Sequence, residues 1–132
     1  MSKHTGSCHC GKVAYEFEGS PITEALDCNC SICGKKGSLL HFIPAASFTL
    51  LTPRAEISTY HFNKGVIDHN FCKTCGVTSF SEGTSPKGDK MVAINARCVD
   101  GVDPKALKVN HFNGREAPLE QNGAQRAPGR DI

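Results

Sequence analysis

The sequence is poor in aromatic residues, has no long apolar run and carries little net charge. It contains no tryptophan, only two tyrosines, and lysine plus arginine exceed aspartate plus glutamate by 15 to 13, a net charge of +2. No apolar stretch approaches the ~18 residues that a membrane-spanning helix needs. So small a charge, without a basic stripe or interleaved tryptophan, gives little support for nucleic acid binding. We therefore expect neither a membrane nor a nucleic acid as the partner.

The beginning and the end of the sequence contain little that could be buried. The first residues, Met1 to Gly6, have no apolar stretch behind Lys3, so we expect no secretory signal and a cytoplasmic protein. A chain of 132 residues with 39% hydrophobic and 21% charged residues fits one globular domain. We place this domain at residues 1–115 and expect the polar stretch 116–132 to be a flexible tail.

Cysteine is the residue type that the sequence has in excess, with eight in 132 positions. Seven of them fall into three tight groups, which are Cys8-His9-Cys10, Cys28-Asn29-Cys30-Ser31-Ile32-Cys33 and Cys72-Lys73-Thr74-Cys75. Cys98 stands alone. In a reducing compartment such clusters bind metal more often than they form disulfides, and closely spaced cysteine pairs are typical zinc ligands. The sequence therefore predicts two Zn²⁺ ions.

The spacing of the cysteines leaves their assignment to the two metals open. Structural zinc takes four tetrahedral ligands, whereas catalytic zinc has three protein ligands and an open position. One partition forms a closed site from Cys8, Cys10, Cys72 and Cys75 and an open site from Cys28, Cys30 and Cys33. The Cys8 pair could instead join the middle group, and Cys98 or a histidine could close that group and make both metals structural. A disulfide framework and a redox-active pair at Cys72 and Cys75 are weaker alternatives, because neither a signal peptide nor a βαβ pattern accompanies them.

Short β-type segments separated by turn residues predict a mainly β fold. Val13, Tyr15 and Phe17 alternate with more polar residues, which indicates a half-buried strand. Further strands are expected at 22–27, 39–43, 48–52, 57–62, 67–71, 77–81 and 91–96. Asp103-Pro104 is the one clear helix start, and a single helical turn is expected after Ser31.

The other reactive side chains offer no convincing general base. His9 lies between two cysteines and is expected to point away from the metal. His41, His61 and His69 lie within expected strands, where packing or surface roles are the simplest interpretation. The pair Lys35-Lys36 follows the middle cysteine group directly. It is either a solvated turn or a cationic rim that attracts the carboxylates of an acidic thiol such as glutathione.

Three ordered motifs, at residues 6–13, 28–33 and 71–77, are similar to the signature of the glutathione-dependent formaldehyde-activating enzyme family, whose domain also occurs in centromere protein V. Further matches at 42–48 and 94–101 extend the resemblance from about Gly6 to Asn113. The resemblance implies a mainly β, Mss4-like (β-tent) zinc-binding fold with short helical turns. It also implies a structural Zn²⁺ at Cys8, Cys10, Cys72 and Cys75 and a catalytic Zn²⁺ at Cys28, Cys30 and Cys33.

The namesake activity of this family joins formaldehyde and glutathione into S-(hydroxymethyl)glutathione, formally a carbon–sulfur lyase reaction. The resemblance thus implies a zinc-dependent lyase that acts on a thiol, glutathione or similar, and a small aldehyde or its adduct. It implies no catalytic side chain beyond the ligands of the second zinc. Many members have arginine directly after the third middle cysteine, where this sequence has Gly34 followed by two lysines. The middle cysteine motif with these lysines is more similar to the centromere protein V-like branch. A non-enzymatic zinc module that binds protein or nucleic acid is therefore the second hypothesis.

Overall fold

The computed structural model describes residues 2–61, 67–85 and 87–114. Within them the chain forms ten strands, one short α-helix and four 3₁₀ turns. In chain order these are β1 (Ser2–Ser7), β2 (Ala14–Gly19), β3 (Glu24–Cys28), α1 (Cys33–Lys36), β4 (Leu40–Pro44), η1 (Ala45–Ser47), β5 (Phe48–Leu50), η2 (Arg54–Glu56), β6 (Ile57–Tyr60), β7 (His69–Cys72), β8 (Phe80–Thr84), β9 (Lys90–Asn95), η3 (Ala96–Cys98), η4 (Pro104–Ala106) and β10 (Lys108–Phe112). The fold is mainly β, as the sequence predicts.

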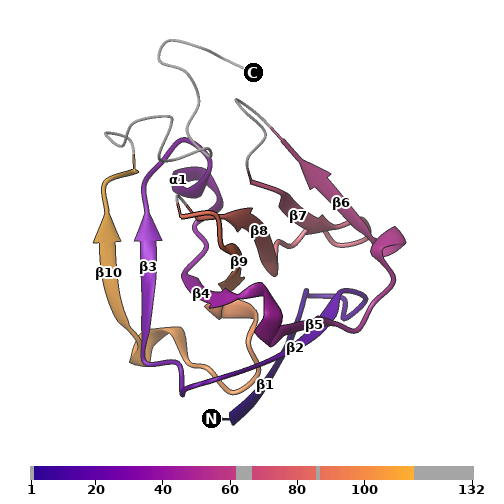
Figure 1. Ribbon diagram of the computed structural model, residues 1–132, viewed down its shortest axis with the longest axis horizontal. Coiled ribbons are helices and arrows are strands. Elements are labelled where there is room, and N and C mark those ends of the chain that lie inside the picture. The colour runs from indigo at the N-terminus through magenta and orange to yellow at the C-terminus, as the bar shows by residue number, and fades with distance from the viewer. Residues whose placement is uncertain (1, 62–66, 86, 115–132) are drawn as a thin grey trace.

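The strands form three sheets (Figure 1). A five-stranded sheet has the order β10-β3-β4-β9-β8, and a three-stranded sheet has the order β1-β2-β5. Strands β6 and β7 pair by themselves. The pair β10–β3 is parallel and its two arrows point the same way in Figure 1, whereas all other paired strands are antiparallel. A bridge between Asp68 and Glu82 joins the β6–β7 hairpin to the edge strand β8.

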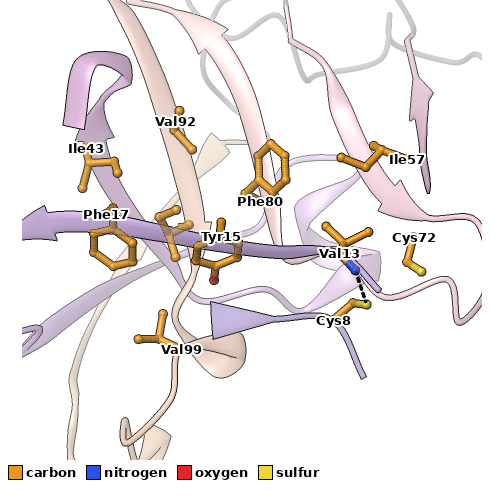
Figure 2. Packing of buried hydrophobic residues seen from close by; sticks show 11 residues of the cluster. Cys8, Val13, Tyr15, Phe17, Ile43, Ile57, Cys72, Phe80, Val92 and Val99 are labelled. Atoms are coloured by element: carbon orange, nitrogen blue, oxygen red, sulfur yellow. Dashed lines mark hydrogen bonds between the residues drawn. The ribbon is translucent and has the colours of Figure 1, made fainter. Parts of the chain in front are cut away.

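The core lies between the three-stranded sheet and one face of the five-stranded sheet (Figure 2). The expected alternation in β2 is confirmed, because Tyr15 and Phe17 are 0% and 1% exposed. Tyr15 packs against Phe80 from β8 with ring centroids 6.0 Å apart. Cys8 and Cys72 belong to the same buried cluster and lie at one end of it in Figure 2. The first cysteine group is thus anchored in the main core.

Several expectations need correction. The strand expected at 77–81 begins only at Phe80, because residues 76–79 continue as an extended loop from the second cysteine pair. The helix expected from Asp103 is a single 3₁₀ turn, η4, in which the Asp103 carboxylate accepts a hydrogen bond from the Lys105 backbone N–H at 3.0 Å. The sequence does not predict strands β1 and β10, because neither segment has an alternating pattern of apolar and polar residues. The tail predicted at 116–132 falls outside the described residues.

Gly6 allows a close approach of two elements that hold the first cysteine group. It pairs with Tyr15 across β1 and β2 and bridges to Val99. A Cβ atom at Gly6 would lie 2.5 Å from the Tyr15 hydroxyl oxygen and 2.7 Å from the backbone carbonyl oxygen of Cys98. The Tyr15 ring is fully buried and its hydroxyl has no hydrogen-bond partner among the described residues, so it has little room to move.

We therefore expect Gly6→Ala to destabilise the protein by about 1–3 kcal/mol, the usual cost of overpacking a core. The melting temperature should fall by roughly 5–10 °C in a circular dichroism melt. Gly19→Ala is the matched control, because Gly19 also lies in the β1–β2 pair but nothing lies within 4 Å of a Cβ there. Equal melting temperatures for the two variants would show that Tyr15 and Cys98 can move aside.

Candidate metal centres and an adjoining cavity

The structure brings the first and third cysteine groups together. Cys8 and Cys10 lie in the turn between β1 and β2, whereas Cys72 ends β7 and Cys75 follows in the next turn. Their four Sγ atoms lie within 4.8 Å of one another, with Cys8–Cys10 at 3.7 Å and Cys10–Cys72 at 3.6 Å. Four sulfurs at the zinc–sulfur distance of about 2.3 Å in a tetrahedron would be ~3.8 Å apart. The cluster therefore has the donor chemistry and spacing of a structural zinc site.

Both cysteine pairs lie in turns of the same design. Gly11 and Gly76 follow the second cysteine of each pair with φ angles of 82° and 78°, a region that glycine enters without strain. The N–H groups of these glycines donate to the carbonyl oxygens of Cys8 and Cys72, respectively. The Val13 N–H donates to the Cys8 Sγ at 3.3 Å, the dashed line in Figure 2. Such turns direct both sulfurs of a pair toward one point.

Backbone N–H groups favour the thiolate form of two cysteines of this cluster. Hydrogen bonds from the backbone of Val77 and then Cys10 lower the pKa of Cys75 to about 6. The pKa of Cys72 is lowered in the same way by the N–H groups of Cys75 and Thr74. The Lys12 backbone lowers the pKa of Cys10, but desolvation and hydrogen bonds with the Cys72 and Cys8 sulfurs outweigh this effect and raise that pKa to about 11. Metal binding requires deprotonated sulfur, so Cys72 and Cys75 are the members that the backbone prepares for it.

The middle cysteine group forms a second cluster, separate from the first. Cys28 ends β3, Cys33 begins α1, and Cys30 lies in the turn between them. Their three Sγ atoms lie within 4.8 Å of one another, and Cys28 and Cys30 are buried. The turn is closed by a hydrogen bond from the Gly34 N–H to the Cys30 carbonyl at 2.8 Å. Helix α1 is the single helical turn that the sequence predicts after Ser31.

The charge state of the three sulfurs indicates what the cluster can bind. Hydrogen bonds from the Cys28 and Cys33 thiols lower the pKa of Cys30 to about 2. The pKa of Cys33 is raised, because its proton is shared with Cys28 and Cys30. The three sulfurs thus compete for protons, so that ionising one opposes ionising the others, and a dication would allow all three to ionise. This donor set fits Zn²⁺.

Among the described residues, no fourth cysteine, histidine, aspartate or glutamate completes the three-cysteine cluster. Cys98 lies outside both clusters, and burial raises the pKa of its thiol to about 11. Its Sγ donates to the carbonyl oxygen of Thr78 at 3.8 Å. The structure therefore groups the predicted ligands as four and three.

A cavity of about 260 Å³ adjoins the three-cysteine cluster. All five strands of the large sheet contribute to its wall, through Phe112, Leu26, Cys28, Leu40, Phe42, Ala93, Asn95 and Ser81. The register explains this, because directly paired residues share one face of a sheet. Phe42 pairs with Ala93 and Ala93 pairs with Ser81, while Cys28 pairs with Phe112. One face of the sheet covers the core, and the other forms the cavity wall.

Sequence reasoning missed His69 as a cavity residue. It lies on β7, is 6% exposed and lines the cavity beside the three-cysteine cluster. Desolvation lowers its pKa to about 4, so the ring is neutral at pH 7. His41 and His61 do not line this cavity, and His9 is exposed and outside the four-cysteine cluster. Only the tertiary structure, in which β7 lies beside β8 and His69 reaches the same cavity as the middle cysteine group, could have identified His69.

Two further polar residues define the cavity in different ways. The Asn95 carboxamide is committed to the backbone, since it accepts from the N–H groups of Leu39 and Arg97 and donates to the carbonyl of Thr78. Lys36, on α1, lies at the cavity wall and is exposed to solvent on its other side. Desolvation lowers its pKa, although the nearby cysteines oppose this. Lys36, rather than Lys35, is therefore the cation closest to the site.

Two cysteine clusters lie on a mainly β scaffold, one anchored in the core and one beside a cavity, and both could hold a metal ion such as zinc. Residues 3–113 match the family described as glutathione-dependent formaldehyde-activating enzyme, and the chain belongs to this family. A crystal structure of a Rhodobacter sphaeroides protein has a similar fold, with a TM-score of 0.69 at 24% identity over 80% of this chain and 99% of that chain. Among the described residues, no helix is long and apolar enough to cross a membrane.

Proposed function

We propose that this protein is a zinc-dependent carbon–sulfur lyase that acts on a thiol and a small aldehyde, or on their adduct. The observation that supports this most is the three-cysteine cluster, which has no fourth ligand among the described residues and adjoins an accessible cavity. A structural site would have four ligands and no need of a cavity. The family model, whose description names a glutathione-dependent enzyme acting on formaldehyde, supports the same reaction class.

The two clusters have different roles in this proposal. Cys8, Cys10, Cys72 and Cys75 hold a structural Zn²⁺ that connects the β1–β2 turn to the end of β7. Cys28, Cys30 and Cys33 hold the second Zn²⁺ at the cavity. When bound, that ion supplies a positive charge that lowers the pKa of a thiol and keeps it as the nucleophilic thiolate at neutral pH. Cysteines remain reduced and able to bind metal in a reducing compartment, so the proposal places the protein in the cytoplasm. In this proposal both sites belong to a single domain, residues 1–115.

The reaction needs no oxidant or reductant. The sulfur lone pair forms a bond to the aldehyde carbon, the carbonyl π electrons move to oxygen, and oxygen takes up the proton that the thiol lost. The reverse reaction breaks the same carbon–sulfur bond. The Lys36 ammonium, at the cavity wall, attracts an anionic group of the substrate. His69, whose ring is neutral at pH 7, lies at the same wall and adds no charge there.

One experiment distinguishes the lyase from the second hypothesis, a non-enzymatic zinc module. Zinc bound per chain is measured during incubation with a mild chelator, with and without excess 2-mercaptoethanol. We expect the content to fall from two ions toward one, because the three-cysteine site has fewer ligands. The thiol should slow this loss, and ethylene glycol, which has oxygen in place of sulfur, should not.

Two zinc ions that resist the chelator and ignore the thiol would contradict the lyase proposal. That outcome would mean that the second site is closed, and would favour the binding module.

A further inference from the structure

The cavity face of the large sheet is unusually apolar. An antiparallel sheet commonly packs one face on the core and presents polar residues on the other. In β4 and β9 the core face carries Ile43, Val92 and Ile94, as that pattern requires. The opposite face carries Leu40, Phe42 and Ala93, which line the cavity instead of meeting another layer of the core. Asn95 is the polar residue of this face in these two strands, and its carboxamide is already hydrogen-bonded to the backbone. This face is apolar although it adjoins the metal cluster rather than the interior.

Two aromatic side chains of the cavity wall are exposed to solvent. Phe42 on β4 is 49% exposed and Phe112 on β10 is 45% exposed. Both line the cavity that contains the three cysteines, and neither belongs to a buried cluster among the described residues. Exposed apolar surface of this kind, when it is contiguous, marks a binding site. A ligand whose sulfur reaches the cysteines would cover these rings.

The apolar surface continues beyond the first cavity. A second cavity of about 330 Å³ lies along β8 and β9 and shares Phe42, Ile67, Ser81 and Ala93 with the first. Met91 extends this surface toward the far end. The two cavities together form a groove that begins at the three-cysteine cluster and runs along the sheet.

The charges of the groove are too few for a zwitterionic peptide. Lys36 is the one lysine or arginine that the described chain contributes to either cavity. The groove's Glu82 is already paired with Arg54, with two hydrogen bonds of 2.7 and 3.0 Å. Glutathione carries two carboxylates and one ammonium at neutral pH, and charges that lose water without gaining a partner weaken binding. The groove matches a ligand with an apolar body and a single negative charge or none.

We propose that the substrate thiol of this site carries an alkyl or aromatic group next to its sulfur and at most one carboxylate, which pairs with Lys36. The inference rests on the proposed function, because it assumes that the three-cysteine site binds a thiol. The proposed thiol differs from glutathione, which is the thiol that the family resemblance implies. The sulfur lies at the cysteine cluster, and the apolar body lies against Leu40, Phe42 and Ala93.

Direct binding to the zinc-loaded protein tests this without reference to turnover. Phenylmethanethiol and glutathione are titrated into ¹⁵N-labelled protein, and shifts of backbone amides in β4 and β9 give the two dissociation constants. We expect phenylmethanethiol to bind about ten- to a hundredfold more tightly, because its ring is buried against apolar side chains. Benzyl alcohol, which keeps the ring but lacks sulfur, should bind more weakly than the thiol.

Ala93→Phe places a ring at a wall position that the two cavities share and should weaken phenylmethanethiol binding at least about tenfold. Ala106→Phe, in the exposed turn η4, is the matched control and should change neither binding nor zinc content. If Ala93→Phe proves unfolded, Ala93→Leu with the same titration replaces it.

The outcomes separate the two proposals. Tighter binding of glutathione, or no effect of the Ala93 variants, would overturn the apolar substrate and leave the lyase proposal standing. If neither thiol binds while zinc remains in place, both are overturned.

Discussion

Cys8→Ser is expected to abolish the cooperative thermal unfolding transition of the isolated protein. Structural zinc contributes an apparent ~10–16 kcal/mol to small zinc domains. A domain of this size has a total stability of only about 5–15 kcal/mol. Cys8 is 4% exposed within the main hydrophobic cluster, so loss of the metal would also leave a polar hydroxyl in the core. Circular dichroism melts, with zinc per chain measured on the same samples, should show a largely unfolded protein that has lost the ion.

Cys98→Ser is the matched control for this prediction. Cys98 is also partly buried, but it lies outside both clusters and makes one weak hydrogen bond to the Thr78 carbonyl. A serine hydroxyl can make that bond, so we expect a change below ~1 kcal/mol. A Cys8→Ser protein that melts like Cys98→Ser and keeps its zinc would show that the four-cysteine cluster does not hold the fold together.

The cysteine clusters could be predicted because their geometry is local. Each pair lies in a turn that a glycine completes, so Cys8-His9-Cys10-Gly11 predicts most of its own structure. The grouping into four and three does not follow from the spacing, which would also let the Cys8 pair join the middle group. The family resemblance implies this grouping, and the fold brings Cys8 and Cys10 to Cys72 and Cys75. The alternation around Tyr15 is local in the same sense, because a strand needs only its own residues to define an inner face.

The cavity could not be predicted, because it depends on the order of strands from distant parts of the chain. Strand β10 pairs in parallel with β3, some 80 residues earlier, and this pairing places Phe112 beside Cys28. Strand β10 has no alternating pattern, so nothing in its sequence indicates a partner. From the sequence His69 is an ordinary strand histidine, and only the fold places it at the cavity that the middle cysteine group also lines. The residues that line the cavity are therefore brought together by long-range pairing. The metal-binding cysteines come as local motifs, although the four-cysteine cluster also needs the fold to join two of these motifs.

Cys30→Ser is expected to abolish activity while leaving the protein folded. The three-cysteine cluster belongs to a small hydrophobic cluster of its own, separate from the core around Tyr15, so its loss leaves that core intact. Zinc content should fall from two ions to one. The rate of adduct formation between a thiol and formaldehyde should fall by more than about 100-fold, because replacing even residues outside the ligand shell of a metal site costs ~10–100-fold. Nuclear magnetic resonance of the adduct methylene group gives this rate directly.

The distinction between an enzyme and a binding module depends on this variant, because Cys30 contributes to the second site alone. A folded Cys30→Ser protein with one zinc and full activity would contradict a catalytic role for the cluster and leave the cavity without a reaction. Cys98→Ser, measured in parallel, should keep both zinc ions and the full rate, since its thiol reaches neither cluster. If Cys30→Ser is instead unfolded, the second cluster is structural, and the open position on which the lyase proposal depends does not exist.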